Sequence, residues 1–175
     1  MAVNAAQTAA NQVQAAIILE AIGDPIPEQV QRALTRFFPG QTSEFLELLH
    51  LRITQVGSIM PSVRIRHISS VPRHMTAMDP DAPFHSGSIV SGNPARAFPD
   101  ASYIATYPSW YWANYRPLQP VILLHEGFHY YYAHMRVGHP ANTPTINPRA
   151  YQGFIATLAG LPLGAPVTSQ YPAVP

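Results

Sequence analysis

Val121-Ile122-Leu123-Leu124 runs directly into His125-Glu126-Gly127-Phe128-His129, an H-E-x-x-H pattern preceded by four apolar residues. The apolar run predicts a buried helix that continues through the pattern. Positions i and i+4 lie one turn apart on the same helical face, so His125 and His129 can direct their imidazoles at one zinc ion. Glu126 can reach a zinc-bound water and take its proton. The stretch therefore predicts the active-site helix of a zinc enzyme.

A catalytic zinc site usually has three protein ligands, and the sequence after the pattern restricts the third. No Asp or Glu follows Glu126, which leaves His134 and His139 as downstream candidates. His134 would lie about 180° around the helix from His125 and point away from the metal. His139 follows Gly138, a residue that lets the chain turn back toward the helix. We therefore expect His139 to complete the zinc site.

Upstream residues remain alternatives for the third ligand. They are two histidines and two aspartates: His67, His85, Asp79 and Asp81. The other histidines are expected to be exposed or hydrogen-bonded imidazoles: His50, His74 and His134.

The N-terminal part of the chain predicts a layer of helices over residues 4–57. Apolar residues recur at helical spacing within residues 4–21 and 27–38. Ser43 is expected to cap a third helix. We expect these helices to pack together as one layer.

Residues 62–107 predict a small sheet and a long loop. Val63–Ile68 alternates in polarity and is rich in β-branched residues, as in a strand, and Ser102–Tyr107 is expected to be a short edge strand. Met75–Asp100 is dominated by Pro, Gly, Ser and Asp. A loop of this length is usually functional or disordered, so it could cover the active-site cleft.

Two helices are expected in the C-terminal part. The active-site helix should cover about residues 118–137 and end at Gly138. Asn147-Pro148, a capping residue followed by proline, predicts the start of a helix over about residues 148–159. The fold expected over residues 1–175 is a single α+β domain, mostly helical, with a small sheet and a zincin-like active-site helix.

Composition excludes several classes of function. The 175 residues include ten arginines and no lysine, carry a net charge of +1 and lack cysteine. Disulfides and thiol nucleophiles are thus excluded, and without a basic stripe we expect no nucleic-acid partner. No apolar run reaches the length of a membrane span. The N-terminus shows no export signal, so the compartment stays open, including that of a domain within a larger secreted protein.

From Tyr103 onward the chain resembles the deuterolysin-type metallopeptidases, or aspzincins, in divergent form. In that family H-E-x-x-H is followed by G-T-x-D-x-x-Y-G, whose Asp is the third zinc ligand, and His139 stands at that place here. Asn147–Phe154 is similar to the family's N-A-D-x-Y-x-x-F segment. The chain departs from the family in having histidine for the Asp and Asn142 for the Tyr.

The metzincin pattern H-E-x-x-H-x-x-G-x-x-H does not match either. Ala133 and Met135 stand where its Gly and third His belong. The resemblance therefore implies a zincin of an outlying type, with three histidine ligands. By analogy, small zincin domains without cysteine are often toxin or effector domains of secretion systems.

The predicted activity is hydrolysis of peptide bonds in a peptide or protein substrate by zinc-activated water. Glu126 would act as general base, and Tyr151 would stabilise the oxyanion, with Tyr130, Tyr131 and Tyr132 as alternatives. An extended substrate would add to the edge of Ser102–Tyr107. Two other interpretations stay open: a non-catalytic metal-binding or interaction domain, and a zinc amidase acting on peptidoglycan.

Overall fold

A computed structural model describes residues 1–68, 94–136, 138–140 and 142–173. Within these ranges the chain is a mostly helical α+β domain with one small sheet, which confirms the predicted fold class. The helices are α1 Ala2–Ala21, α2 Glu28–Phe37, α3 Phe45–Ile59, α6 Gln119–Tyr131, α7 Pro148–Leu158 and α8 Ala165–Gln170. The strands are β1 Arg64–His67, β2 Ala95–Phe98 and β3 Tyr103–Thr106.

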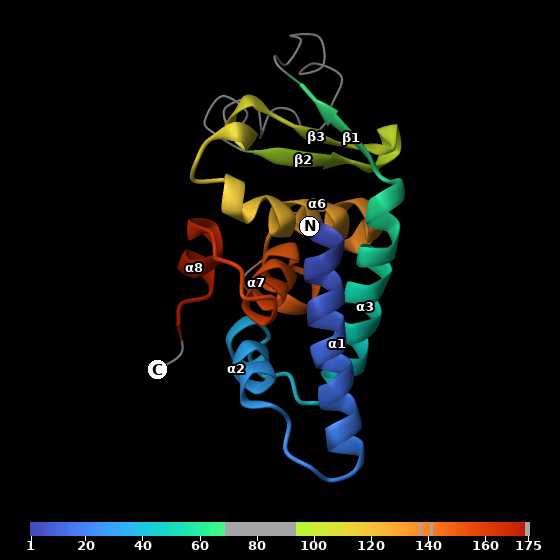
Figure 1. Cartoon of the computed structure of the whole chain (residues 1–175), viewed down its shortest axis with the longest axis vertical. Coiled ribbons are helices and arrows are strands. Elements are labelled where there is room, and N and C mark those ends of the chain that lie inside the picture. Colours follow the sequence, from blue (N-terminus) through green and yellow to red (C-terminus); the bar gives the residue numbers. More distant parts are fainter. Residues whose placement is uncertain (69–93, 137, 141, 174–175) are drawn as a thin grey trace.

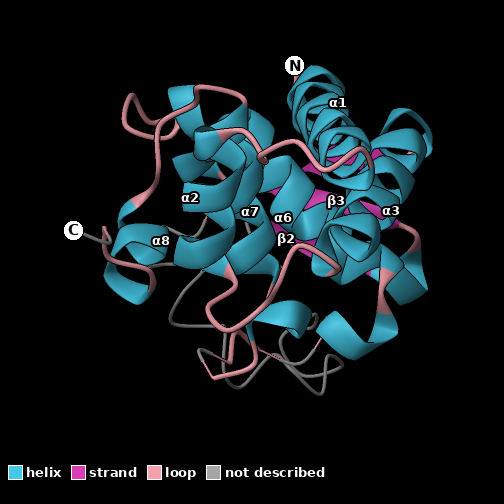
Figure 2. Ribbon diagram, turned by 90° about the horizontal axis from the view of Figure 1, so that it is seen from below, coloured by secondary structure: helices cyan, strands magenta, loops and turns pink. Residues whose placement is uncertain are grey.

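The helix α6 lies between the sheet and the other helices (Figure 1). On one side it contacts β2, and on the other it contacts α1, α3 and α7. Seen from below, the helices lie in front of the sheet (Figure 2). The approach of α3 is close at Gly127, where a Cβ atom would lie 2.9 Å from the side chains of both Val56 and Met60. Glycine in the H-E-x-x-H pattern thus lets α3 pack against the back of α6.

The N-terminal helices α1, α2 and α3 are present, but the prediction that Ser43 caps the third of them is wrong: α3 begins at Phe45, and Glu44 is at the N-cap position without a side-chain hydrogen bond. The helices α1 and α3 lie side by side along most of their length (Figure 1). The buried face of α1 is almost all alanine, interrupted by Val13. Small side chains let the two helices approach closely: a Cβ atom on Gly57 of α3 would lie 3.0 Å from the Cβ atom of Ala6.

The sheet differs from the expectation in the position of β3. Its strand order is β1-β3-β2, with β3 parallel to β1 and antiparallel to β2. The stretch Ser102–Tyr107 is therefore a central strand, and the prediction of an edge strand is wrong. The reason is β2, which lies within the segment 75–100 that was expected to be a loop. Only four residues long and preceded by Pro94, β2 has little local strand signal and depends on its pairing with β3.

The active-site helix is shorter than expected. It begins at Gln119 as predicted, but it ends at Tyr131 and not near residue 137. Tyr132 adopts an extended conformation, with φ −100° and ψ 109°, so the chain leaves the helix there. Met135, in the segment after this exit, is buried in the core. The final predicted helix is present as α7, and Asn147 caps it by accepting a hydrogen bond from the Arg149 backbone N–H at 3.0 Å.

Among the described residues, no helix has both the length and the apolar character needed to cross a membrane.

Candidate metal centre

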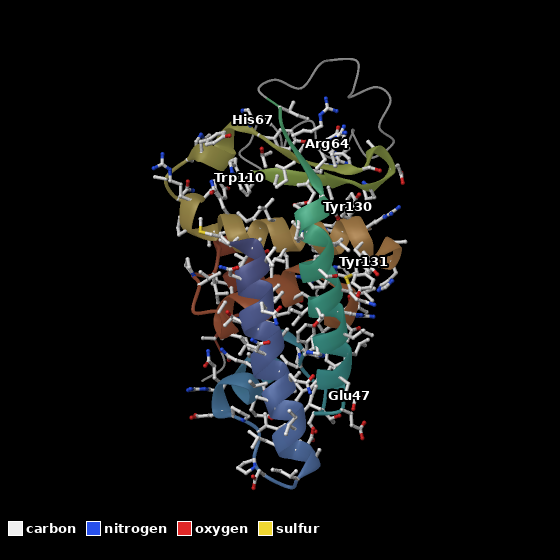
Figure 3. The ribbon with its side chains drawn as sticks, turned by 45° about the vertical axis from the view of Figure 1, so that its right-hand side comes forward. Glu47, Arg64, His67, Trp110, Tyr130 and Tyr131 are labelled. Atoms are coloured by element: carbon white, nitrogen blue, oxygen red, sulfur yellow. The ribbon has the colours of Figure 1, made fainter. Side chains whose placement is uncertain are left out.

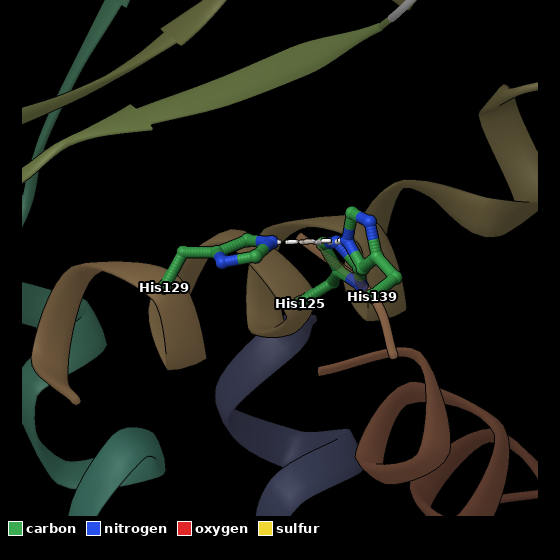
Figure 4. A group of neighbouring side chains, drawn as sticks. All are labelled: His125, His129 and His139. Atoms are coloured by element: carbon green, nitrogen blue, oxygen red, sulfur yellow. Dashed lines mark hydrogen bonds between the residues drawn. The ribbon is translucent and has the colours of Figure 1, made fainter. Parts of the chain in front are cut away.

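Three histidines converge at one point beside α6 (Figure 4). His125 and His129 extend from successive turns of α6, and His139 comes from the segment after it. The Nε2 atoms lie 3.2 Å apart between His125 and His129, 3.1 Å between His129 and His139, and 2.9 Å between His125 and His139. We call these residues the histidine cluster. Its members are those that the sequence predicted as zinc ligands, and the group could hold a metal ion.

Hydrogen bonding alone does not account for this arrangement. An imidazole nitrogen either carries one hydrogen or presents a lone pair. Among three such atoms at least two are of the same kind, so at least one of the three contacts is not a hydrogen bond. A shared cation satisfies all three nitrogens together. In a tetrahedral zinc site, with Zn–N bonds of about 2.0–2.1 Å, the nitrogens lie about 3.3–3.4 Å apart, close to the spacing seen here.

The ring of His129 is oriented by a backbone carbonyl. Its Nδ1 lies 2.6 Å from the Met135 carbonyl oxygen. A carbonyl can only accept, so Nδ1 carries the hydrogen, and in the neutral ring Nε2 presents its lone pair to the cluster. Metal-binding histidines are commonly held in this way by a second hydrogen bond. The early end of α6 thus has a direct consequence for the site, because it brings the Met135 carbonyl under the ring.

The third histidine is positioned by a turn and by two side chains from elsewhere in the chain. Gly138 has φ +70°, a conformation that residues with a Cβ atom rarely adopt. The His139 carbonyl accepts a hydrogen bond from the Gln170 side chain at 3.0 Å. The Pro140 carbonyl accepts one from the Asn147 side chain at 3.1 Å. The expected role of Gly138 in turning the chain back is consistent with this geometry.

His125 is buried and is held in its neutral form. Burial lowers its pKa well below the usual value, and the neighbouring His129 and His139 and the positive charge of Arg149 lower it further. The Gln152 side chain acts in the opposite direction through hydrogen bonding. Within the described part of the chain, Nδ1 of His125 forms no hydrogen bond of good geometry, so the contact between Gln152 and His125 is weak. A neutral imidazole is the form that binds a metal.

Glu126 faces the sheet. Its Oε2 atom accepts a hydrogen bond from the Ala97 backbone N–H at 2.7 Å. Burial raises the pKa of Glu126 to about 8, against the lowering effects of this hydrogen bond and of Arg96. The Ala97 amide points away from β3, since the neighbouring positions of β2 form the hydrogen-bonded pairs with that strand. Glu126, next to His125 on α6, therefore contacts the outer edge of β2, which has no paired strand within the described part of the chain.

The structure places Tyr151 in a different group of polar side chains. Its hydroxyl donates to the Thr145 carbonyl at 2.8 Å and accepts a hydrogen bond from Arg52. The ring is fully buried and packs against the ring of Phe128. The hydroxyl is thus engaged away from the three histidines, and the expected role in oxyanion stabilisation has no support from its position.

Tyr132, one of the alternatives to Tyr151, belongs to the same group. Its hydroxyl donates to Oε1 of Gln55, and the Arg52 guanidinium lies 5.6 Å from its ring centre. We call this group the arginine cluster: Arg52, Gln55, Tyr132, Thr145 and Tyr151. The two other tyrosines, Tyr130 and Tyr131, follow His129 on α6 and are labelled in Figure 3. Tyr131 is 42% exposed.

Of the remaining predicted candidates, the two that the structure describes, His67 and His134, lie outside the histidine cluster. His67 lies on the exposed strand β1, where its ring contacts Tyr111 at a centroid distance of 5.1 Å (Figure 3). His134 is exposed and lies beside Tyr132, as expected for a histidine without a metal role. Four candidates fall in residues 69–93, outside the described part of the chain: His74, Asp79, Asp81 and His85.

Two residues near the cluster were not predicted from the sequence. Arg149 and Gln152 lie about one turn apart on α7, and both affect the pKa of His125. Gln152 is buried, and Arg149 is half-buried. Their i, i+3 spacing on a helix that is otherwise largely apolar is a signal that could have identified them.

Comparison of the chain with family models, with curated proteins and with solved structures gives no match. The function is therefore argued from the geometry of the site.

Proposed function

We propose that this protein is a zinc-dependent metallopeptidase, in which the histidine cluster binds the metal and Glu126 acts as general base. The observation that carries the proposal is the convergence of three Nε2 atoms, none more than 3.2 Å from the next, beside a buried carboxylate. Metal binding alone does not require Glu126. A glutamate next to the first ligand favours hydrolysis over a purely structural site.

In the proposed hydrolysis, the metal and Glu126 have different roles. When bound, zinc lowers the pKa of a water molecule toward about 7 and polarises a carbonyl group. Glu126 accepts the proton of the attacking water and then delivers it to the leaving amine. To do so, its carboxylate must turn from the Ala97 amide toward the cluster. That movement frees an N–H on the outer edge of β2.

The outer edge of β2, which pairs with no strand among the described residues, replaces β3 as the expected place for the substrate. Because β3 is paired on both sides, it offers no hydrogen-bonding groups to a peptide. The outer edge of β2 lies beside Glu126 and can pair with an extended chain. This placement supports a peptide as the substrate.

Metal content tests the site first. We expect about one zinc ion per chain in the wild-type protein and none in His125→Ala or His139→Ala. The control is His67→Ala, which removes an exposed histidine of β1 and should leave the metal in place. Absence of zinc from chelator-free wild-type protein, with none taken up on titration, contradicts the proposal.

Hydrolysis tests the second part. The wild-type protein should cleave casein or a library of quenched fluorescent peptides, and Glu126→Gln should retain zinc and lose cleavage. Zinc binding without cleavage of any peptide would instead favour a non-catalytic metal-binding domain. Cleavage of purified peptidoglycan without cleavage of casein would favour an amidase.

A further inference from the structure

Arg149 is a half-buried cation for which the described residues provide no counter-ion. It is the second residue of α7, and burial lowers its pKa from the usual value. Among the described residues no carboxylate pairs with it, and the sequence has no acidic residue after Glu126. Its side chain has one hydrogen bond within the described part of the chain, a long one of 3.5 Å to the Gln170 amide oxygen. Burying part of a guanidinium with so few partners is unfavourable unless another group accepts hydrogen bonds from it.

Hydrogen bonds connect Arg149 to the histidine cluster. Gln170, which accepts from Arg149, donates from its amide nitrogen to the His139 carbonyl at 3.0 Å. Asn147 caps the backbone N–H of Arg149 and holds the Pro140 carbonyl. The same positive charge lowers the pKa of His125. Arg149 therefore borders the cluster on the side formed by α7.

This position is electrostatically unfavourable for a site that binds a divalent cation. Arginine stays protonated, so its charge repels a metal held by the three histidines. An anionic group that lies between the guanidinium and the metal removes this repulsion. The guanidinium fork binds a carboxylate through two parallel hydrogen bonds, which makes a carboxylate the best-matched anion.

We propose that Arg149 binds the C-terminal carboxylate of the peptide substrate, so that the site prefers peptides with a free C-terminus. The inference rests on the proposed metallopeptidase function and adds a substrate class to it. A terminal carboxylate is a permanent charge that a peptide brings to the site, whereas the transient oxyanion of hydrolysis can be neutralised by the metal itself. Arg149 is thus the residue that selects the substrate.

Binding of a peptide series to zinc-loaded protein tests the proposal. The series is acetyl-Ala-Ala-Phe as the free acid, the same peptide as the amide, and acetyl-Ala-Ala-Glu amide, which moves the carboxylate to a side chain. Calorimetric titration into the Glu126→Gln variant avoids hydrolysis during the measurement. Into this background we introduce Arg149→Gln and Arg149→Lys. The matched control is Arg32→Gln, which removes an exposed arginine of α2 that pairs with Glu28.

We expect the free acid to bind at least about tenfold more tightly than either amide, as a charge-assisted pair provides. Arg149→Gln should abolish this difference and Arg149→Lys should reduce it, while Arg32→Gln should keep it. Zinc content and circular dichroism show that each variant is folded and loaded.

Three outcomes overturn the proposal. Equal affinity for acid and amide excludes recognition of the terminus, and a preference that survives Arg149→Gln assigns it to another residue. A glutamyl amide that binds as tightly as the free acid shows recognition of a side-chain carboxylate. Zinc content separates these failures from failure of the metallopeptidase itself: one zinc ion per chain without a preference overturns this inference alone, whereas no zinc overturns both.

Discussion

The arginine cluster and the histidine cluster both draw on the end of α6, yet they leave their polar atoms in opposite states. In the arginine cluster the hydroxyls and the guanidinium find partners within the chain: Tyr151 with Thr145 and Arg52, and Tyr132 with Gln55. In the histidine cluster the three Nε2 atoms face one another, and hydrogen bonds among these three atoms cannot account for all three contacts.

The difference shows how a polar cluster that stabilises the fold can be distinguished from one that binds a ligand. A satisfied network fixes neighbouring elements relative to one another and offers nothing to a ligand. Nitrogens that cannot all satisfy one another, as in the histidine cluster, are costly to bury unless a further group binds them. Tyr151, predicted as a catalytic residue, lies in the first kind of cluster, and the comparison assigns it a structural role.

The strongest test of this contrast compares Glu126→Gln with Tyr151→Phe. We expect the first change to lower kcat/KM by about 100- to 10,000-fold with zinc retained, because general-base catalysis contributes on that scale. Tyr151→Phe should lower the free energy of unfolding by about 1 kcal/mol through a lost hydrogen bond, and change kcat/KM little. Peptide hydrolysis and urea unfolding measure the two effects. A large loss of kcat in a well-folded Tyr151→Phe protein would show that Tyr151 has a catalytic role after all.

Opening the arginine cluster should affect stability and not the metal. Arg52→Met removes the hydrogen bonds to Thr145 and Tyr151, and we expect the free energy of unfolding to fall by about 2–3 kcal/mol. Zinc affinity should change by less than about twofold, because the cluster shares no hydrogen-bonded atom with the histidines. Arg32→Met serves as the control, since its exposed ion pair contributes less than about 1 kcal/mol. Equal effects of the two substitutions on unfolding would contradict a structural role for Arg52.

Much of the fold could be predicted because its signals are local. Helical spacing, the Asn147 cap and the apolar run before His125 depend on neighbours in sequence, and α1, α2, α3 and α7 lie close to where these signals placed them. The position of His139 followed from a local argument as well, since glycine before it permits the turn. These features required no knowledge of the tertiary structure.

The features that sequence reasoning missed depend on distant partners. The strand β2 depends on its pairing with β3, and the contact of the Met135 carbonyl with His129 forms only because α6 ends at Tyr131. Whether the Tyr151 hydroxyl is free depends on Arg52, about a hundred residues earlier. The charge of Arg149 affects His125 only because the fold packs α7 beside the histidines. None of these relations can be read from spacing.

Gln152 allows a finer comparison with Gln55, the glutamine of the arginine cluster. Gln152→Leu removes the polar group beside His125, and because their contact is weak we expect zinc affinity to fall by about tenfold, the lower end of the range for groups that orient a metal ligand. Gln55→Leu removes the acceptor of Tyr132 and should lower stability by about 1 kcal/mol with zinc affinity unchanged. Competition titration against a zinc indicator measures the affinities. Unchanged zinc binding in Gln152→Leu would show that His125 is oriented by packing alone.

The smallest effect should come from Gly138, which can be compared with a second glycine far from the site. Gly138 and Gly23 have φ of +70° and +82°, and a Cβ atom at either would meet nothing within 4 Å. Substitution by alanine therefore adds backbone strain of about 1 kcal/mol at each position without a clash. In Gly138→Ala the strain can relax by moving His139 away from the cluster, so zinc affinity should fall about fivefold. In Gly23→Ala it should stay at the wild-type value. Equal zinc affinity in the two variants, with equal loss of stability, would show that His139 keeps its place without the turn.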